Sequence, residues 1–250
     1  MTPEQSRRYC RQIRLPAIGE AGQGALLASR VLVIGMGGLG SPAAMYLAAA
    51  GVGTLVISDF DRVEDSNLQR QIVHRAEDIG ELKARSAART LTALNPACTV
   101  VVKDWQLDGE ELAAEVTSAD LIVDCCDNFA TRFALNRVAV RCGKPLVSGA
   151  AIRTEGQIIS LFPDRGPCYQ CLYPGDLEQE HSCAMEGVLA PVVGVIGSLQ
   201  ALQAIQILTG NAAELVGRLQ LFDALGADWR CVRVPRDPDC PVCGGKQATV

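Results

Sequence analysis

A glycine-rich turn between a predicted strand and a predicted helix constrains the fold of this chain more than any other part of its sequence. Residues 35–40 have the sequence Gly-Met-Gly-Gly-Leu-Gly; they follow the β-branched run 30–34 and precede an alanine-rich segment, 41–50, with Pro42 in its first turn. Glycines let the backbone approach a phosphate closely, and the N-terminus of a helix offers oriented N–H donors. The motif therefore predicts a nucleotide site; NAD is the default ligand of such a turn, and a turn without a ligand is the alternative.

Short apolar runs alternate with helical segments through the first 150 residues. Further strands are predicted at 54–58, 99–103, 121–124 and 145–148, and helices at 81–94, 109–116 and 131–141. This alternation predicts a doubly wound, mostly parallel α/β sheet covered on both faces. After about residue 151 the runs 156–162, 218–222 and 229–234 indicate a more antiparallel extension, with a long loop at 163–187. We expect one domain, 1–250, with a nucleotide-binding part at 1–150 and a second part at 151–250.

Composition excludes several classes of function. The chain has 250 residues, a net charge of −5 and 48% hydrophobic residues, so we expect no nucleic-acid or membrane partner. The N-terminal residues lack the apolar core of a signal peptide, which predicts a cytoplasmic protein with reduced thiols. Uncharged stretches at 31–58 and 187–213 are interrupted by glycines. Gln200, Gln203 and Gln206 in the second predict the polar edge of a mostly buried helix rather than a membrane span.

Charged residues cluster near the predicted carboxyl ends of the strands. Asp59 follows the second strand at about the spacing of a ribose-binding carboxylate, and Asp127 follows the run 121–124, inside which Asp124 lies. Because the carboxyl ends of parallel strands share one edge, Asp59 and Asp127 should meet the glycine turn there. Arg70 and Lys83 can neutralise a triphosphate and its magnesium. The alternative for Asp127 is an ordinary surface turn, and for each cation a solvated side chain.

Cysteines form a second constellation. Two C-x-x-C pairs, Cys168/Cys171 and Cys240/Cys243, predict a structural tetrathiolate zinc site; two unrelated redox or buried pairs are the alternative. Cys183 lies in a polar loop near His181, as an exposed nucleophile or merely a loop thiol. Cys10 stays unassigned. Five cysteines are expected to behave as small hydrophobic residues: Cys98, Cys125, Cys126, Cys142 and Cys231.

These motifs together resemble the MoeB/ThiF/HesA family, the bacterial relatives of ubiquitin-activating enzymes. The resemblance runs over nearly the whole chain and includes RYCRQI (8–13), VLVIGMGGLGSP (31–42), DFDRVEDSNLQRQ (59–71), DCCDN (124–128), both C-x-x-C pairs and APVVGVIGSLQALQAI (190–205). It implies a Rossmann-like fold, a homodimer, and ATP-dependent adenylation of the C-terminal glycine of a ubiquitin-like sulfur carrier protein that ends in Gly-Gly. The second part of the chain, 151–250, would bind zinc and the carrier.

The resemblance also implies roles for individual residues. Asp59 would hold the ribose, and the turn at Gly38 and Gly40 would pack against the nucleotide. Arg11 resembles an arginine that family members insert from the neighbouring subunit, and Cys183 matches a loop cysteine that some members use covalently. The remaining nucleotide-binding set comprises three phosphate contacts, a magnesium ligand and its neighbour: Asn67, Arg70, Lys83, Asp127 and Asn128.

The carrier and two rival classes stay open. Residues 148–158 and 223–226 are most similar to the branch that activates molybdopterin synthase, whereas the two C-x-x-C segments are also similar to the thiamine-thiazole branch. A sulfurtransferase or cysteine desulfurase is a further candidate partner, and the sulfur donor stays open. An NAD-dependent oxidoreductase would need an acid/base residue, for which His74 and His181 have no obvious setting. A non-catalytic carrier-binding scaffold is the other rival.

Overall fold

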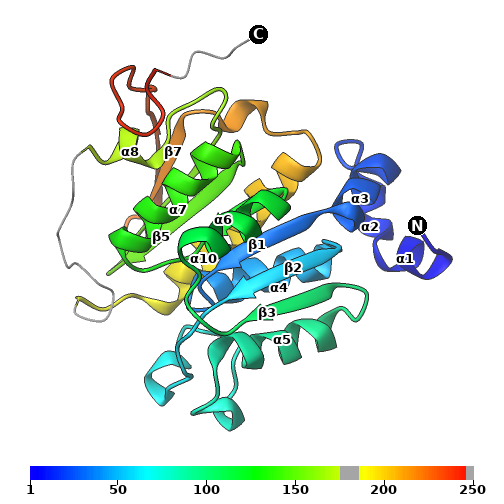
Figure 1. The fold of residues 1–250 in the computed structure, drawn as a ribbon. Coiled ribbons are helices and arrows are strands. Elements are labelled where there is room, and N and C mark those ends of the chain that lie inside the picture. The colour runs from blue at the N-terminus through cyan, green and yellow to red at the C-terminus, as the bar shows by residue number, and fades with distance from the viewer. Residues whose placement is uncertain (175–185, 246–250) are drawn as a thin grey trace.

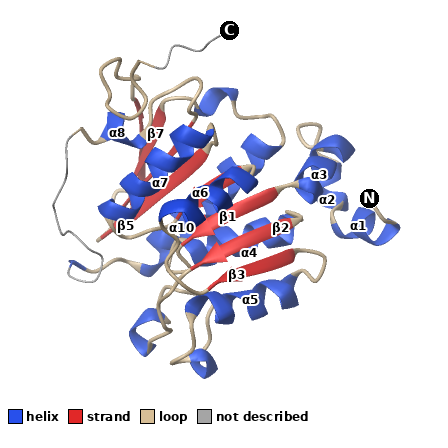
Figure 2. Ribbon diagram, viewed as in Figure 1, coloured by secondary structure: helices blue, strands red, loops and turns tan. Residues whose placement is uncertain are grey.

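An eight-stranded mixed sheet forms the centre of the molecule (Figure 2). The computed structural model describes residues 1–174 and 186–245. The strand order is β3-β2-β1-β4-β5-β6-β7-β8; β1 to β5 are parallel and β6 to β8 are added antiparallel. The strands are β1 Arg30–Ile34, β2 Thr54–Ser58, β3 Thr99–Lys103, β4 Leu121–Asp124, β5 Leu146–Ile152, β6 Glu155–Leu161, β7 Arg218–Asp223 and β8 Asp228–Arg233. This order confirms the predicted parallel sheet with an antiparallel extension.

Helices cover both faces of this sheet, α4 and α10 behind it and α6 and α7 in front in the view of Figure 1. The described helices are α1 Pro3–Arg8, α2 Cys10–Ile13, α3 Gly19–Ala28, α4 Gly40–Ala50, α5 Lys83–Leu94, α6 Gly109–Ser118, α7 Phe129–Cys142, α8 Tyr169–Leu172 and α10 Ala190–Leu208. Short 3-10 turns occupy Asp65–Asn67, Ala76–Asp78 and Ala213–Leu215. The predicted helices at 41–50, 81–94, 109–116 and 131–141 are α4, α5, α6 and α7.

Each central strand supplies residues to two separate cores, because successive side chains point to opposite faces. In β1, Val31 and Val33 join the cluster under α4 and α10, whereas Leu32 joins the cluster under α6 and α7. All three are fully buried. A strand that is apolar on both faces is what a sheet sandwiched between helices requires, and this explains why 31–34 is a continuous hydrophobic run.

Helix α10 corrects one expectation about its glutamines. By length and composition α10 could cross a membrane, but it packs against α4, β5 and β6 as a core helix. The side chains of Gln200 and Gln203 are 0% and 3% exposed, so they are not a polar edge. Gln200 Nε2 donates to the carbonyl of Asp124 (2.6 Å), and Gln203 Nε2 donates to Gln220 Oε1 (2.8 Å). These glutamines tie the helix to the sheet through polar contacts.

The expectation for the five apolar-segment cysteines holds only in part. Cys98, Cys125 and Cys126 are buried, and burial raises the pKa of the Cys98 thiol to about 11. Cys231 is instead exposed on the edge strand β8, with Arg218 Nε donating to its sulfur at 3.3 Å. The position of β8 explains the error: it is the terminal strand of the sheet, and all six of its residues are exposed.

Candidate active site

A cavity of about 1280 Å³ lies where the chain changes direction across the sheet. The chain leaves β1 for β2 on one side and reaches β4 on the other, and the carboxyl ends of these strands surround the cavity. Such a switch point is where open α/β sheets bind ligands. The lining includes these residues predicted from the sequence: Gly38, Asp59, Arg70, Lys83, Asp127 and Asn128. The structure therefore brings the glycine turn, the carboxylates and both cations to one site.

The glycine turn is shaped by close backbone contacts and by Asp59. Gly35 has φ +93°, a left-handed conformation that favours glycine. Asp59 accepts hydrogen bonds from the N–H groups of Met36 (2.7 Å) and Asp61 (2.9 Å). Burial raises the pKa of Asp59 above its ordinary value, and the positive charge of Lys83 opposes that rise. Asp59 thus holds the turn in place while it lines the cavity.

The two predicted glycines of the turn differ in position. Gly38 lines the cavity, and a β-carbon there would approach Val193 of α10 to 2.9 Å. Gly40 is buried and does not line the cavity; a β-carbon there would collide with the carbonyl oxygen of Gly35. The expectation that Gly40 packs against a nucleotide is therefore not supported by its position: this glycine permits the start of α4 to pack against the turn.

Two cations enter the cavity from the segment after β2 and from α5. Lys83, in the first turn of α5, has a side chain that is 9% exposed, and its Nζ lies 2.9 Å from Asp61 Oδ2. Arg70 is half-buried and donates from Nη1 to the carbonyl of Ser66 (3.1 Å). Asn67 is buried outside the lining, and its Oδ1 accepts from the N–H of Glu64. Asn67 therefore closes the local turn rather than facing the cavity.

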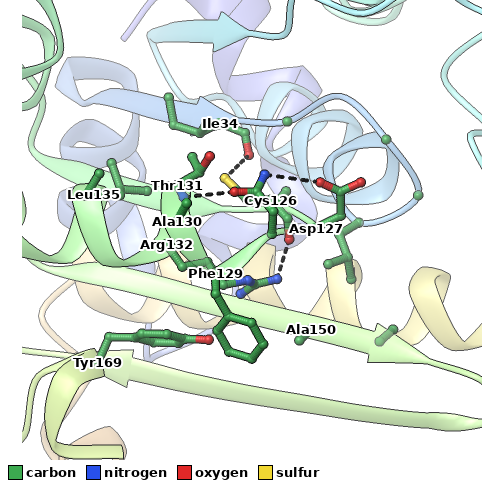
Figure 3. Close-up of a pocket in the computed structure, with 18 of the residues that line it drawn as sticks. Ile34, Cys126, Asp127, Phe129, Ala130, Thr131, Arg132, Leu135, Ala150 and Tyr169 are labelled. Atoms are coloured by element: carbon green, nitrogen blue, oxygen red, sulfur yellow. Dashed lines mark hydrogen bonds between the residues drawn. The ribbon is translucent and has the colours of Figure 1, made fainter. Parts of the chain in front are cut away.

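Asp127 stands at the junction of β4 and α7, over a buried ion pair (Figure 3). Beneath it, Arg132 Nη1 lies 3.0 Å from Asp124 Oδ2, and Arg132 also donates to the carbonyl of Cys126. Burial acts to lower the pKa of Arg132, but Asp124 together with the neighbouring Tyr169 and cysteine side chains holds that pKa above its ordinary value. Asn128 caps α7 by accepting from the N–H of Thr131 at 2.9 Å. These contacts fix the backbone on both sides of the exposed Asp127.

Sequence reasoning missed two residues at this site. Arg132 gave no signal, because an isolated arginine in a helical segment normally faces solvent. Gln71 follows Arg70 directly and lines the cavity, and it is 4% exposed. Among the described residues its Oε1 has no hydrogen-bond partner, a rare condition for a buried polar atom. Such an atom at the cavity wall indicates a donor that comes from a ligand or its water.

Arg11 is not part of the cavity of this chain. Arg11 lies on α2, which is tied to the far end of α4: Gln12 Nε2 donates to the carbonyl of Ala50 at 3.0 Å. The glycine turn is at the opposite end of α4, about 16 Å away by the rise of an 11-residue helix. Arg11 therefore sits near the amino ends of the strands, away from the cavity. Cys183 and its neighbour His181 lie outside the described residues.

The two C-x-x-C pairs come together as one cluster. The four sulfur atoms of Cys168, Cys171, Cys240 and Cys243 lie within 4.8 Å of one another. The Cys168–Cys240 and Cys171–Cys243 sulfur pairs are 3.6 and 3.4 Å apart. A tetrahedral zinc ion with bonds of about 2.3 Å separates its sulfur ligands by roughly 3.8 Å, so the cluster fits such an ion with little adjustment. The cluster joins α8 to the segment after β8, and it can hold a metal.

Comparisons with known proteins agree with this geometry. Residues 9–242 match the model of the ThiF family. The chain belongs to the ThiF family. It is 46% identical over 250 residues to the sulfur carrier protein ThiS adenylyltransferase of Escherichia coli K12, covering 99% of each chain. It is 45% identical over 245 residues to the molybdopterin-synthase adenylyltransferase of the same organism, covering 98% of each.

The ThiF-family fold is also found among solved structures. The crystal structure of E. coli MccB with MccA-N7isoASN superposes with a TM-score of 0.83 at 22% identity, covering 95% of this chain and 74% of that one. At this identity the likeness concerns the fold. Together with the family match it confirms the Rossmann-like sheet and the resemblance stated from the motifs. This ThiF-family chain is an enzyme of the adenylyltransferase class. The hypotheses of an NAD-dependent oxidoreductase and of a non-catalytic scaffold are therefore rejected.

Proposed function

We propose that this enzyme adenylates the C-terminal glycine of a ubiquitin-like sulfur carrier protein with ATP and releases pyrophosphate. One observation carries the proposal: Asp59, Arg70, Lys83 and Asp127 line one cavity beside the glycine turn. That cavity gathers what the reaction needs, namely close backbone for phosphates, cations to neutralise them and an exposed carboxylate for a metal ion. One named relative is an adenylyltransferase of the sulfur carrier protein ThiS and the other a molybdopterin-synthase adenylyltransferase, which supports the substrate class.

The nucleotide would lie over the glycine turn. Asp59 would accept from a ribose hydroxyl in addition to the two backbone N–H groups that it already binds. Gly38 leaves room for the phosphates because no side chain projects there, and Asn128 lines the same wall. The Oε1 of Gln71, which has no hydrogen-bond partner among the described residues, would accept a hydrogen bond from the bound ligand or from its water. A nucleotide bound in the cavity would explain why the Oε1 of Gln71 is buried without a partner among the described residues.

The chemistry needs charge neutralisation more than acid–base catalysis. The carrier's terminal carboxylate is already ionised at neutral pH and attacks the α-phosphorus; a new P–O bond forms as the bond to pyrophosphate breaks. The barrier is dominated by the approach of two anions, which Arg70 and Lys83 relieve. Asp127 would bind Mg²⁺ as a single carboxylate ligand, and the ion would supply further positive charge at the phosphates. A well-placed arginine is worth roughly three to five powers of ten in rate.

Arg11 would complete the site from a second copy of the chain, as a homodimer. Within one chain α2 lies at the end of α4 that faces away from the glycine turn, so Arg11 cannot serve its own cavity. Arg11 is exposed. A second chain placed against the open side of the cavity can present its exposed arginine there, as the resemblance implies.

The carrier's tail would enter along β5 and β6. The cavity continues from Asp127 past Ala150, Ala151 and Gly156, all small residues. A narrow floor of small side chains suits an extended Gly-Gly tail, since a larger side chain would occupy the space of the tail backbone. The carrier is the small subunit of molybdopterin synthase in our proposal. The thiamine-thiazole carrier is the alternative, because the two named relatives favour neither.

The four-cysteine cluster would hold zinc in a structural role. Four thiolates leave no open coordination position for water, so this metal would join α8 to the C-terminal segment rather than take part in catalysis. Cys183 would act as a covalent nucleophile in this scheme, and a separate sulfurtransferase or cysteine desulfurase would be a further partner. We place the whole reaction in the cytoplasm.

Carrier-dependent ATP–pyrophosphate exchange tests the assignment. Arg70→Ala and Asp127→Ala are expected to abolish exchange while the circular dichroism spectrum and melting temperature stay those of the wild type. Arg75→Ala is the matched control: the Arg75 side chain is 68% exposed, outside the cavity lining, and only five residues from Arg70. Wild-type exchange in either active-site variant would contradict the assignment. Mixing the enzyme with each purified carrier and ATP, then measuring the acyl-adenylate by intact mass, distinguishes the two carriers.

A further inference from the structure

A buried histidine connects three segments that form the cavity wall. His74 is 6% exposed, and both of its ring nitrogens are engaged. Nε2 lies 3.0 Å from the carbonyl oxygen of Met36 in the glycine turn, and Nδ1 lies 2.8 Å from Ser86 Oγ. Ser86 belongs to α5, one turn after Lys83. His74 itself ends the segment that carries Arg70. The imidazole is therefore the junction of the glycine turn and the two segments that carry the cations.

The hydrogen positions follow from the partners. A carbonyl oxygen only accepts, so the hydrogen bond to Met36 requires a proton on Nε2. Burial lowers the pKa of His74, which keeps the ring neutral near pH 7, and Nδ1 is then an acceptor for the Ser86 hydroxyl. Ser86 Oγ also donates to Asp78 Oδ2 at 2.8 Å, and because a hydroxyl has one proton it donates to either Asp78 or Nδ1 at any moment. The hydrogen bond from Nε2 to Met36 therefore fixes the ring, which cannot turn without losing that bond.

The peptide groups of Met36 are held from two sides. Its N–H donates to Asp59 Oδ2 at 2.7 Å, and its carbonyl accepts from His74. The side chain of Met36 is fully buried as well. Because a peptide unit is planar, holding the Met36 carbonyl sets the direction of the Gly37 N–H, and Gly37 lines the cavity. A change at His74 therefore alters the phosphate-binding surface without touching it directly.

Further hydrogen bonds hold the residues around His74 in place against α5. Asp78 accepts from Arg89 Nη2 at 2.6 Å and from the N–H of Arg75 at 2.8 Å, so the carboxylate that faces Ser86 is fixed in place. Thr90 Oγ1 donates to the carbonyl of Val73 at 2.8 Å, which holds the backbone next to His74. The junction is therefore a rigid connection between α5 and the glycine turn rather than a mobile side chain.

We infer that His74 is a positioning residue that sets the glycine turn at a fixed distance from Arg70 and Lys83, so that one triphosphate contacts all three. The inference rests on the nucleotide site proposed above. It assigns His74 no contact with the substrate: the residue acts through the carbonyl of Met36. The affinity for ATP, and not that for the carrier, should depend on this side chain.

Two substitutions with different hydrogen-bonding capacity test the inference. His74→Leu removes the donor to Met36, whereas His74→Gln keeps an N–H near the position of Nε2. Titration calorimetry with Mg-ATP is expected to show about tenfold weaker binding for His74→Leu and at most about threefold for His74→Gln, the range that one net hydrogen bond produces. The KM for the carrier should stay at the wild-type value in both.

Thr90→Val is the matched control, because it removes a hydrogen bond from the same segment without touching the imidazole. A merely structural role for His74 would lower the melting temperature and the fraction of active enzyme in His74→Leu and Thr90→Val alike, with Kd for ATP unchanged. Should His74→Leu not fold, Ser86→Ala replaces it, with an expected threefold loss of affinity from the unanchored ring. Wild-type ATP affinity in the folded variant overturns the inference. Failure of the wild type itself to bind ATP would instead contradict the proposed function.

Discussion

Replacing Arg132 with methionine is expected to destabilise the fold strongly, because it leaves a buried carboxylate unpaired. The side chains of Arg132 and Asp124 are 6% and 1% exposed, and their charged atoms lie 3.0 Å apart. Ser148 Oγ also donates to Asp124 Oδ2 at 2.6 Å, but a hydroxyl does not neutralise the charge. Methionine fills a similar volume, so the loss reports on charge and hydrogen bonding rather than on a cavity.

The expected magnitude follows from this burial. Breaking a buried ion pair by removing one partner costs about 3–5 kcal/mol in the free energy of unfolding. For a chain of this size, a loss of about 4 kcal/mol lowers the melting temperature by roughly 10 °C. The substitution also removes the donor to the Cys126 carbonyl, next to Asp127, so adenylation should fall together with stability. Urea unfolding followed by circular dichroism measures the first effect.

A double-mutant cycle separates charge from packing. In an Asp124→Asn background there is no negative charge to leave unpaired, so adding Arg132→Met should cost much less than in the wild type. Arg137→Met is the control: Arg137 is exposed on the same helix, and its replacement should change the free energy of unfolding by less than about 0.5 kcal/mol. An equal cost of Arg132→Met in both backgrounds, or a cost below about 1 kcal/mol in the wild type, would refute the reasoning.

Two further outcomes are expected. Cys240→Ser should release one zinc per chain by elemental analysis and lower the melting temperature, whereas exposed Cys231→Ser should do neither; wild-type enzyme without metal would contradict the zinc assignment. Acidification should destabilise the fold through His74, whose pKa burial lowers, with Lys83 adding to the decrease and Asp78 opposing it. Below pH 6.5 the unfolded chain binds a proton that the folded chain does not, so stability falls as the pH drops from 6.5 toward the folded pKa, by at most about 1.4 kcal/mol per pH unit. Urea unfolding between pH 7.5 and 5.5 should show this slope, and His74→Gln should lack it; equal slopes would contradict the prediction.

The layered sheet was predictable because buried parallel strands are recognisable in a sequence as short apolar runs. Each of the five parallel strands in the structure overlaps a predicted run, and the helices between them follow. The strand predicted at 145–148 was too short: β5 continues to Ile152 through Gly149, Ala150 and Ala151. Small residues give no strand signal by themselves, and this segment is extended because β6 pairs with it along its whole length. A short stretch of sequence read by itself does not show which other strand it will pair with.

At the site, residues placed by the ends of strands were predictable and residues placed by packing were not. Asp59 and Asp127 follow β2 and β4, and strand order alone brings both to one edge. Asn67 and Gly40 were expected at the ligand because motif position does not say which way an atom faces. Asn67 closes a turn and Gly40 makes room for α4, and each role depends on contacts with backbone that only the folded chain supplies.

Buried polar pairs are the hardest part of this fold to derive from sequence. They also connect the residues that line the cavity to the helices and segments packed behind them. Hydrophobic periodicity reports which face of an element avoids water, but it assigns every polar residue to the outside. Gln200 and His74 violate that rule, because each donates to a backbone carbonyl where a strand ends and the chain turns: Gln200 to Asp124, the last residue of β4, and His74 to Met36, two residues after β1. A buried carbonyl at the end of a strand needs a hydrogen-bond donor, and where the sheet supplies none a side chain from another element does. The same strand ends carry the cavity, so these two buried donors lie directly behind the active site.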